Sequence, residues 1–268
     1  MTDRMTETCS RQTKLPIAYL EFFGVAERYN VSGALANVRD VEVCSFDPLK
    51  VPIKAVADTT RRAQAIASTI ADTYPHTVAL VAVCTGASLI GPISAELKKR
   101  GIEIWATALI DPANITRDTV QIALQDIAKN LEADFSETSD IGRAAIDEDS
   151  IVWAEGLIQQ WVEGYISANT SDKDLEFRAM LDQLRQRYVN WISFLCAAMN
   201  SPHLQAMPEV SAVFASNERL DAQLGASLAE SAVMHLYDTG GKPCLGEGIC
   251  STAFSSWFER AARDRHHR

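Results

Sequence analysis

A cysteine stands where a buried strand meets a sharp turn and a helix. Residues 78–83 are six consecutive apolar residues, too few for a helix and rich in valine, which predicts a buried central strand. After a short turn, residues 87–100 place apolar side chains at helical spacing. A strand, a tight turn and a helix form a nucleophile elbow, whose usual sequence is Gly-x-Ser-x-Gly. Here it reads Ala82-Val-Cys84-Thr-Gly86, so a cysteine occupies the nucleophile position.

Cys84 has two interpretations. As a nucleophile it would lie at the tip of the sheet beside a helix N-terminus, whose dipole and N–H groups favour a thiolate. The amide of Thr85 would then supply one oxyanion donor, and Phe23 or Gly24 a second. As a structural residue Cys84 would be a small buried side chain, which is common for cysteine. Of the other cysteines, we expect Cys44 in the core.

Composition and charge narrow the class of protein. A chain of 268 residues with 47% hydrophobic content can bury one substantial core. A net charge of −10 disfavours nucleic acid or an anionic membrane as a partner. The apolar runs are far shorter than the roughly 20 residues that cross a bilayer, and residues 1–14 resemble no secretion signal. Six cysteines without C-x-x-C spacing argue against a zinc site and indicate free thiols in a reducing cytoplasm, with Cys9 in the tail.

The rest of the chain alternates between strand and helix patterns. Such alternation indicates an α/β fold with a mostly parallel sheet covered on both faces. The predicted strands are 15–23, 40–46, 78–83, 102–110, 210–215 and 231–237, and the predicted helices are 29–35, 59–74, 87–100, 118–131, 149–167, 172–199 and 251–263. Three consecutive helices interrupt the alternation and predict an inserted lid. We therefore divide the chain into a disordered tail, a two-part core and a helical lid: 1–14, 15–113 with 209–268, and 114–208.

The elbow region resembles the thioesterases of nonribosomal peptide and polyketide assembly lines. The matching text is LVAVCTGASLIGPISAELKKRGIEIWATALIDP, residues 80–112. The resemblance implies an α/β-hydrolase fold with a helical lid. It also implies acyl chemistry on phosphopantetheine thioesters, carried by an acyl or peptidyl carrier protein or by coenzyme A, without a permanently bound cofactor. We expect no metal site, because no pair of histidines or cysteines has ligand spacing on one element. The resemblance places the acid of a catalytic triad at Asp111, where Asp-Pro would otherwise start a turn. Asp221 or Glu218 are alternative acids, because many other α/β-hydrolases keep theirs after the next strand.

The base of a triad is harder to place. In this fold the histidine normally lies in the loop after the last strand, which here reads Gly-Gly-Lys242-Pro-Cys244. His235 is the remaining candidate, inside the last predicted strand. Either that strand ends early and His235 is the base, or the chain lacks one. The other histidines lie before the elbow strand, in the loop that leaves the lid, and at the C-terminus: His76, His203, His266 and His267.

These features favour acyl transfer over hydrolysis. Hydrolysis needs a base to activate water, whereas exchange between two thiols requires mainly a thiolate. A cysteine elbow with a weak or absent base is similar to the acyl and aminoacyl shuttles of nonribosomal pathways. One alternative is a thioesterase that clears misloaded carrier proteins with His235 as base, and another is a non-catalytic acyl-binding protein. The cysteine elbows of dienelactone hydrolases and polyester synthases match less well, because Ala82 and Ala87 stand where those enzymes usually have glycine.

Overall fold

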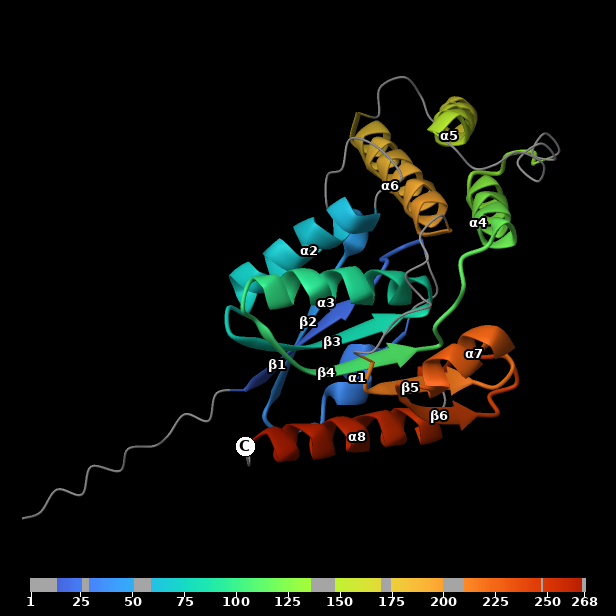
Figure 1. The fold of residues 1–268 in the computed structure, drawn as a ribbon. Helices are drawn as coiled ribbons and strands as arrows, with labels where there is room; N and C mark the ends of the chain where they lie inside the picture. The colour runs from blue at the N-terminus through green and yellow to red at the C-terminus, as the bar shows by residue number, and fades with distance from the viewer. Residues whose placement is uncertain are drawn as a thin grey trace, which may run out of the picture.

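A parallel β-sheet forms the centre of the protein (Figure 1). The computed structural model describes residues 14–25, 29–50, 59–135, 148–169, 175–199, 210–246 and 248–266. Within them, six strands pair in parallel in the order β2-β1-β3-β4-β5-β6. All six carboxyl ends therefore meet at one edge of the sheet. The strands are β1 (Leu15–Leu20), β2 (Val41–Phe46), β3 (Thr77–Val83), β4 (Glu103–Ile110), β5 (Ala212–Ser216) and β6 (Val233–Tyr237).

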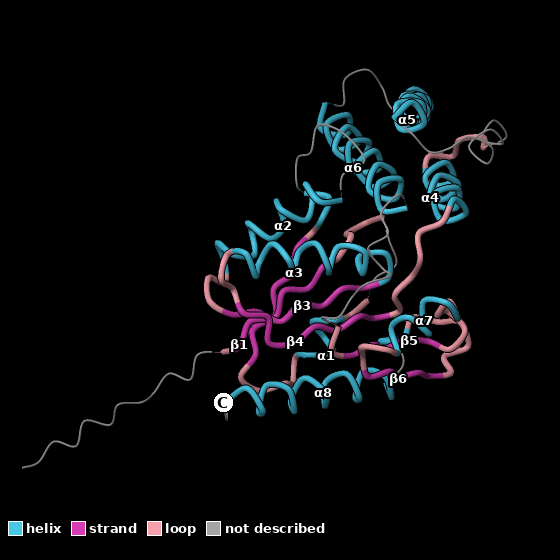
Figure 2. The backbone as a smooth tube through the Cα atoms, in the orientation of Figure 1, coloured by secondary structure: helices cyan, strands magenta, loops and turns pink. Residues whose placement is uncertain are grey.

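Helices cover both faces of the sheet (Figures 1 and 2). One face carries α2 (Thr59–Thr73) and α3 (Ile90–Lys99), and the opposite face carries α1 (Val31–Leu35) and α8 (Gly248–His266). Side chains of β3 alternate between the two resulting cores, with Leu80 packed on the α2 and α3 side and Val81 on the α8 side. A strand buried on both faces is apolar at every position, which explains the unbroken run at residues 78–83.

Three further helices lie near the edge where the strands end, between β4 and β5 in the chain (Figure 1). The last of them packs on the core through aromatic rings: Phe22, which follows β1, lies 4.9 Å from Trp191 and 4.8 Å from Phe194 between ring centroids. These contacts hold this helix, which belongs to the expected lid, against the loop after β1. The three helices are α4 (Arg117–Asn130), α5 (Glu148–Asn169) and α6 (Leu175–Met199).

Most elements agree with the sequence patterns, but two features differ. The helix α7 (Ala222–Ala229) between β5 and β6 was not predicted, because it is only eight residues long and Gly225 weakens its pattern. The turn after β3 is a 3₁₀ helix from Cys84 to Leu89 that leads into α3. Residues 1–13 of the expected tail, and His203 and His267, lie outside the described residues.

The expectation that every cysteine is a free thiol was wrong for two of the six. Cys244 and Cys250 form a disulfide. A short 3₁₀ turn, Cys244–Gly246, leads into the first turn of α8 and brings the two Cα atoms to 5.9 Å, within the range that a disulfide spans. Cys44, Cys84 and Cys196 remain outside disulfides. Among the described residues, no helix combines the length and apolar character needed to cross a bilayer, and no acidic, histidine or cysteine cluster is suited to a metal ion.

Candidate active site at the carboxyl edge of the sheet

Cys84 has the backbone conformation of an elbow residue. It directly follows β3 with φ at +48°, a left-handed conformation that non-glycine residues rarely adopt. Such conformations carry a cost in free energy and cluster at functional sites. The side chain is half-buried at the start of the 3₁₀ turn, where the first N–H groups of a helix have no acceptor within it. The cysteine therefore lies beside backbone donors that suit an oxyanion.

Gly86 lies at a close approach in the same turn. A Cβ atom at this position would lie 3.2 Å from Cε2 of Phe22 and 3.8 Å from Cβ of Ala82. Ala82 and Gly86, the first and last residues of the motif, thus lie close together. Through Gly86 the elbow also packs on Phe22, in the loop after β1. Leu20 of β1 pairs with Ala82 of β3, which places this loop beside the elbow.

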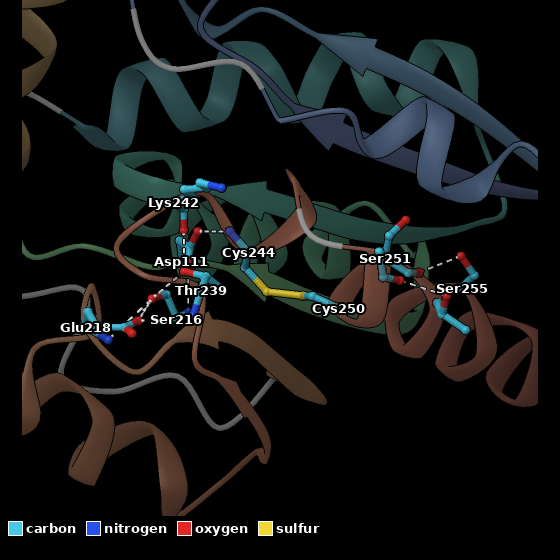
Figure 3. The surroundings of a disulfide bond; sticks show 11 residues. Asp111, Ser216, Glu218, Thr239, Lys242, Cys244, Cys250, Ser251 and Ser255 are labelled. Carbon is cyan, nitrogen blue, oxygen red and sulfur yellow. Dashed lines mark hydrogen bonds between the residues drawn. A yellow bond between two sulfur atoms is a disulfide. The ribbon is translucent and has the colours of Figure 1, made fainter.

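Asp111 lies next to Cys84 but its carboxylate is used by the main chain. Val83 and Ile110 are register partners, so Cys84 and Asp111 follow neighbouring strand ends, and Asp111 also has a positive φ of +42°. Its Oδ1 accepts a hydrogen bond from the N–H of Ser216 at 2.8 Å, and its Oδ2 accepts one from the N–H of Cys244 at 2.7 Å. The side chain is only 3% exposed. This carboxylate therefore fastens β5 and the loop after β6 to the end of β4 (Figure 3).

Glu218 belongs to an adjacent polar network (Figure 3). The Ser216 hydroxyl donates to the Glu218 carboxylate, and the Thr239 hydroxyl lies within hydrogen-bond distance of both the Ser216 oxygen and the Lys242 carbonyl. The N–H groups of Thr239 and Gly240 also donate to Glu218. These hydrogen bonds lower the pKa of the Glu218 carboxyl, and the one from Ser216 has the largest effect. The network fixes the loop in which this fold normally carries its histidine.

The structure does not bring His235 to Cys84. His235 lies within β6 and not beyond its end, and its ring stacks on Phe214 at 4.6 Å between centroids. Val83, Ile110, Phe214 and His235 form one row across four strands. Three strand spacings separate His235 from Val83, which is about 14 Å. The hypothesis that the strand ends early and makes His235 the base is therefore wrong.

The surroundings of His235 also favour its neutral form. Burial lowers the pKa of the imidazole, and the positive charge of Arg260 lowers it further. Its Nε2 is buried and has no hydrogen-bond partner among the described residues. His235 is a packing residue between the sheet and α8.

The loop after β1, which holds Phe23 and Gly24, is tied to the lid. Arg187 of α6 donates from Nε to the carbonyl of Phe23, and its guanidinium forms an ion pair with Asp47 at 2.8 Å. Gly24 has φ at +75°, so the chain reverses direction there in a conformation that suits glycine. Phe23 and Gly24 thus occupy a turn that the lid helix α6 holds, and their role as the second oxyanion donor stays a prediction.

Asp221, the other alternative acid, has a structural role. It is the N-cap of α7, and its Oδ1 accepts hydrogen bonds from the N–H of Leu224 at 2.9 Å and from the amide of Asn114 at 3.3 Å. The anchoring residues Arg187, Ser216 and Thr239 were missed by sequence reasoning. Only their three-dimensional neighbours distinguish them from ordinary polar residues.

Comparison with known proteins identifies the fold. No family model matches the chain, and no curated protein matches it. Solved structures do match over nearly the whole length, at low identity. A hydrolase from Oleispira antarctica aligns with a TM-score of 0.52 at 13% identity, covering 92% of this chain and 91% of that one. The chain has the α/β-hydrolase fold.

Two other solved structures with the same fold differ in chemistry. The NocB thioesterase domain, in a covalent complex with a fluorophosphonate nocardicin G analogue, aligns with a TM-score of 0.53 at 12% identity, covering 94% and 96% of the two chains. A haloalkane dehalogenase variant from Bradyrhizobium elkanii aligns with a TM-score of 0.55 at 11% identity, covering 96% and 93%. Since one fold serves several reactions, the function must be argued from the site.

Proposed function

We propose that this protein is an acyl or aminoacyl transferase that works through a thioester on Cys84. The donor is a phosphopantetheine thioester on an acyl or peptidyl carrier protein or on coenzyme A. The observation that carries the proposal is the left-handed conformation of Cys84 at the junction of β3 and a helical turn. The NocB thioesterase domain among the similar structures supports a thioester as the substrate class.

The reaction exchanges one thioester for another. The Cys84 thiolate attacks the donor carbonyl, the new C–S bond forms, and the donor C–S bond breaks to release the donor thiolate. A second thiolate or an amine then attacks the carbonyl of the acyl-Cys84 thioester, and the C–S bond to Cys84 breaks. Cys84 is released as a thiolate, and an amine acceptor also loses a proton to solvent. The amide of Thr85 and an amide from Phe23 or Gly24 would stabilise the tetrahedral oxyanion.

The arrangement of the remaining groups favours transfer over hydrolysis. Asp111 already binds two main-chain N–H groups, and His235 lies about three strand spacings away. Among the described residues, no histidine therefore completes a triad with Cys84. A thiol acceptor needs less activation than water, because a few per cent of a thiol with a pKa of about 8.5 is already thiolate at pH 7, whereas water is essentially un-ionised there.

Intact-protein mass spectrometry with acyl-CoA and acyl carrier thioesters tests the proposal. We expect one acyl adduct that maps to Cys84 and disappears when a second holo carrier protein is added. Cys84→Ala should abolish the adduct, whereas Cys44→Ser, which removes another half-buried thiol, should retain it. An adduct that persists in Cys84→Ala would contradict the proposal.

A non-catalytic acyl-binding protein is the second candidate. It is favoured by the complete use of Asp111 in main-chain hydrogen bonds. Under this alternative, no thioester would acylate Cys84, while acyl compounds would still bind.

A further inference from the structure

A cavity lies beside the loop that carries Phe23, and it shares no lining residue with a second cavity between the end of α4 and α5. Its volume is about 440 Å³, in the range of small-molecule sites. It is bounded by the loop after β1, the end of β2, the turn after β2 and the middle of α2, and its lining includes Phe23, Phe46, Asp47, Lys50, Ala65, Ile66 and Thr69. Ligands of open α/β sheets bind at the carboxyl ends of the strands, where this cavity lies.

The cavity has an apolar floor. Phe46 and Ile66 are buried members of the core between the sheet and α2, and Ala65 is half-buried on the same helix. The hydroxyl of Thr69 donates to the carbonyl of Ala65, which satisfies its hydrogen. The floor therefore suits a hydrocarbon chain.

The rim of the cavity is positively charged. Asp47 is neutralised by the ion pair with Arg187 at 2.8 Å and by the N–H of Leu49, which donates to its Oδ1 at 3.0 Å. Lys50 is exposed, and its ammonium has no carboxylate partner among the described residues. One unpaired lysine at the mouth of an apolar cavity is suited to the anionic end of a ligand.

A second cation lies one helical turn away. Arg62 precedes Ile66 on α2, is 7% exposed, and donates to the carbonyl of Asn190 at 3.2 Å. Burial lowers the pKa of Arg62 to about 10, so the guanidinium stays charged at neutral pH. No carboxylate of the described residues pairs with it. Arg62 is buried and does not line the cavity, so Lys50 is the cation among the described lining residues, on a protein whose net charge is −10.

The distance to Cys84 matches a medium-length chain. Phe46, Leu20 and Ala82 are register partners across β2, β1 and β3. Two strand spacings, about 10 Å, therefore separate the cavity wall from the elbow strand. Phe23 belongs both to the cavity wall and to the loop proposed to stabilise the oxyanion.

We infer that this cavity takes the acyl group of the substrate, and that this group is an apolar chain with a terminal anion held at Lys50. The link between the cavity and Cys84 rests on the proposed transferase function. Binding of a ligand in the cavity does not rest on that function, because binding needs no covalent chemistry. The two ideas can therefore be tested separately.

The binding test uses Cys84→Ala protein and isothermal titration calorimetry. The probe is monomethyl suberate, whose ester end stands for the thioester and whose carboxylate stands for the terminal anion. We expect it to bind more tightly than neutral dimethyl suberate. Lys50→Met should weaken monomethyl suberate about fivefold and leave dimethyl suberate unchanged, as expected for one exposed charge pair. Lys129→Met, at an exposed lysine on α4, is the matched control and should change neither.

A blocking variant tests the location. Ala65→Phe should fill the cavity and abolish binding of both esters, whereas Gln64→Phe, at the exposed neighbouring position, should retain it. Equal binding of the charged and neutral esters, or binding unaffected by Ala65→Phe, would overturn the inference. If pantetheine 4′-phosphate binds in a Lys50-dependent manner and monomethyl suberate does not, the anion is the phosphate of the carrier arm and the acyl assignment is wrong.

A kinetic comparison separates this inference from the proposed function. With Cys84 intact, we expect suberyl-CoA to acylate the protein faster than octanoyl-CoA, and Lys50→Met to remove the difference. Acylation by both at the same rate would refute the inference and leave the transferase proposal standing. Binding in the cavity without any acylation of Cys84 would refute the transferase proposal and leave the inference about the cavity standing.

Discussion

Asp111 offers a sharp test because its position suggests an acid of catalysis while its contacts are structural. Its two carboxylate oxygens accept hydrogen bonds from the N–H groups of Ser216 and Cys244, at 2.8 and 2.7 Å, in a buried site. We expect Asp111→Asn to lower the stability of the fold and to leave acylation of Cys84 nearly unchanged at temperatures where the variant is folded.

The magnitude follows from the two hydrogen bonds. A hydrogen bond to a charged group contributes about 1.5 to 3 kcal/mol. Asparagine keeps one acceptor oxygen and tolerates the positive φ of Asp111, but its NH₂ group would face the other N–H donor. We therefore expect a loss of about 2 to 3 kcal/mol in the free energy of unfolding. In a chain of this size that corresponds to roughly 5 to 10 °C in the midpoint of thermal unfolding.

Urea unfolding followed by tryptophan fluorescence would measure the stability, and intact-mass kinetics with acyl-CoA would measure acylation. Asp72→Asn, at an exposed position on α2, is the matched control and should change neither quantity. A variant that unfolds like the wild type but acylates a hundredfold more slowly would refute this reasoning. Asp111 would then be a member of a catalytic unit.

Three further predictions concern residues around the site. Burial lowers the pKa of His235, so the imidazole binds a proton more tightly in the unfolded chain than in the folded one. Stability should therefore fall as the pH drops below about 6.5. His235→Phe, which can keep the stack on Phe214, should lose less of its thermal unfolding midpoint than the wild type between pH 7.5 and pH 5.5. Arg187→Met should cost about 3 kcal/mol in urea unfolding, because it leaves the buried carboxylate of Asp47 unpaired. Cys250→Ser should cost about 2 kcal/mol in the same assay, the value expected for opening a short disulfide loop.

Each of these predictions has its own control. A wild-type and a His235→Phe protein with the same pH profile would contradict the first. Arg187→Met should cost little once Asp47→Asn has removed the negative charge, and a full loss in the double variant would show that the ion pair is not responsible. A reductant should lower the urea midpoint of the wild type and have little effect on Cys250→Ser, so equal sensitivity of the two proteins would contradict the third.

The sequence by itself determined the local elements. Residues 78–83 are apolar throughout because β3 is buried on both faces, and this pattern is visible without any neighbour. The position of Cys84 between strand and helix was predicted for the same reason, since an elbow is formed by residues adjacent in the chain. Short or weakly patterned elements escaped this reasoning, as the eight-residue α7 did.

The tertiary structure alone decided the roles of the polar groups, because those depend on residues far apart in the chain. The carboxylate of Asp111 meets partners 105 and 133 residues away, and Arg187 meets Phe23 across 164 residues. Whether His235 faces the elbow or the α8 side depends on the pairing of β6 with β5, which no local pattern specifies. Strand register, and not residue type, therefore separates the proposed nucleophile from His235, the histidine that the sequence analysis offered it as a base.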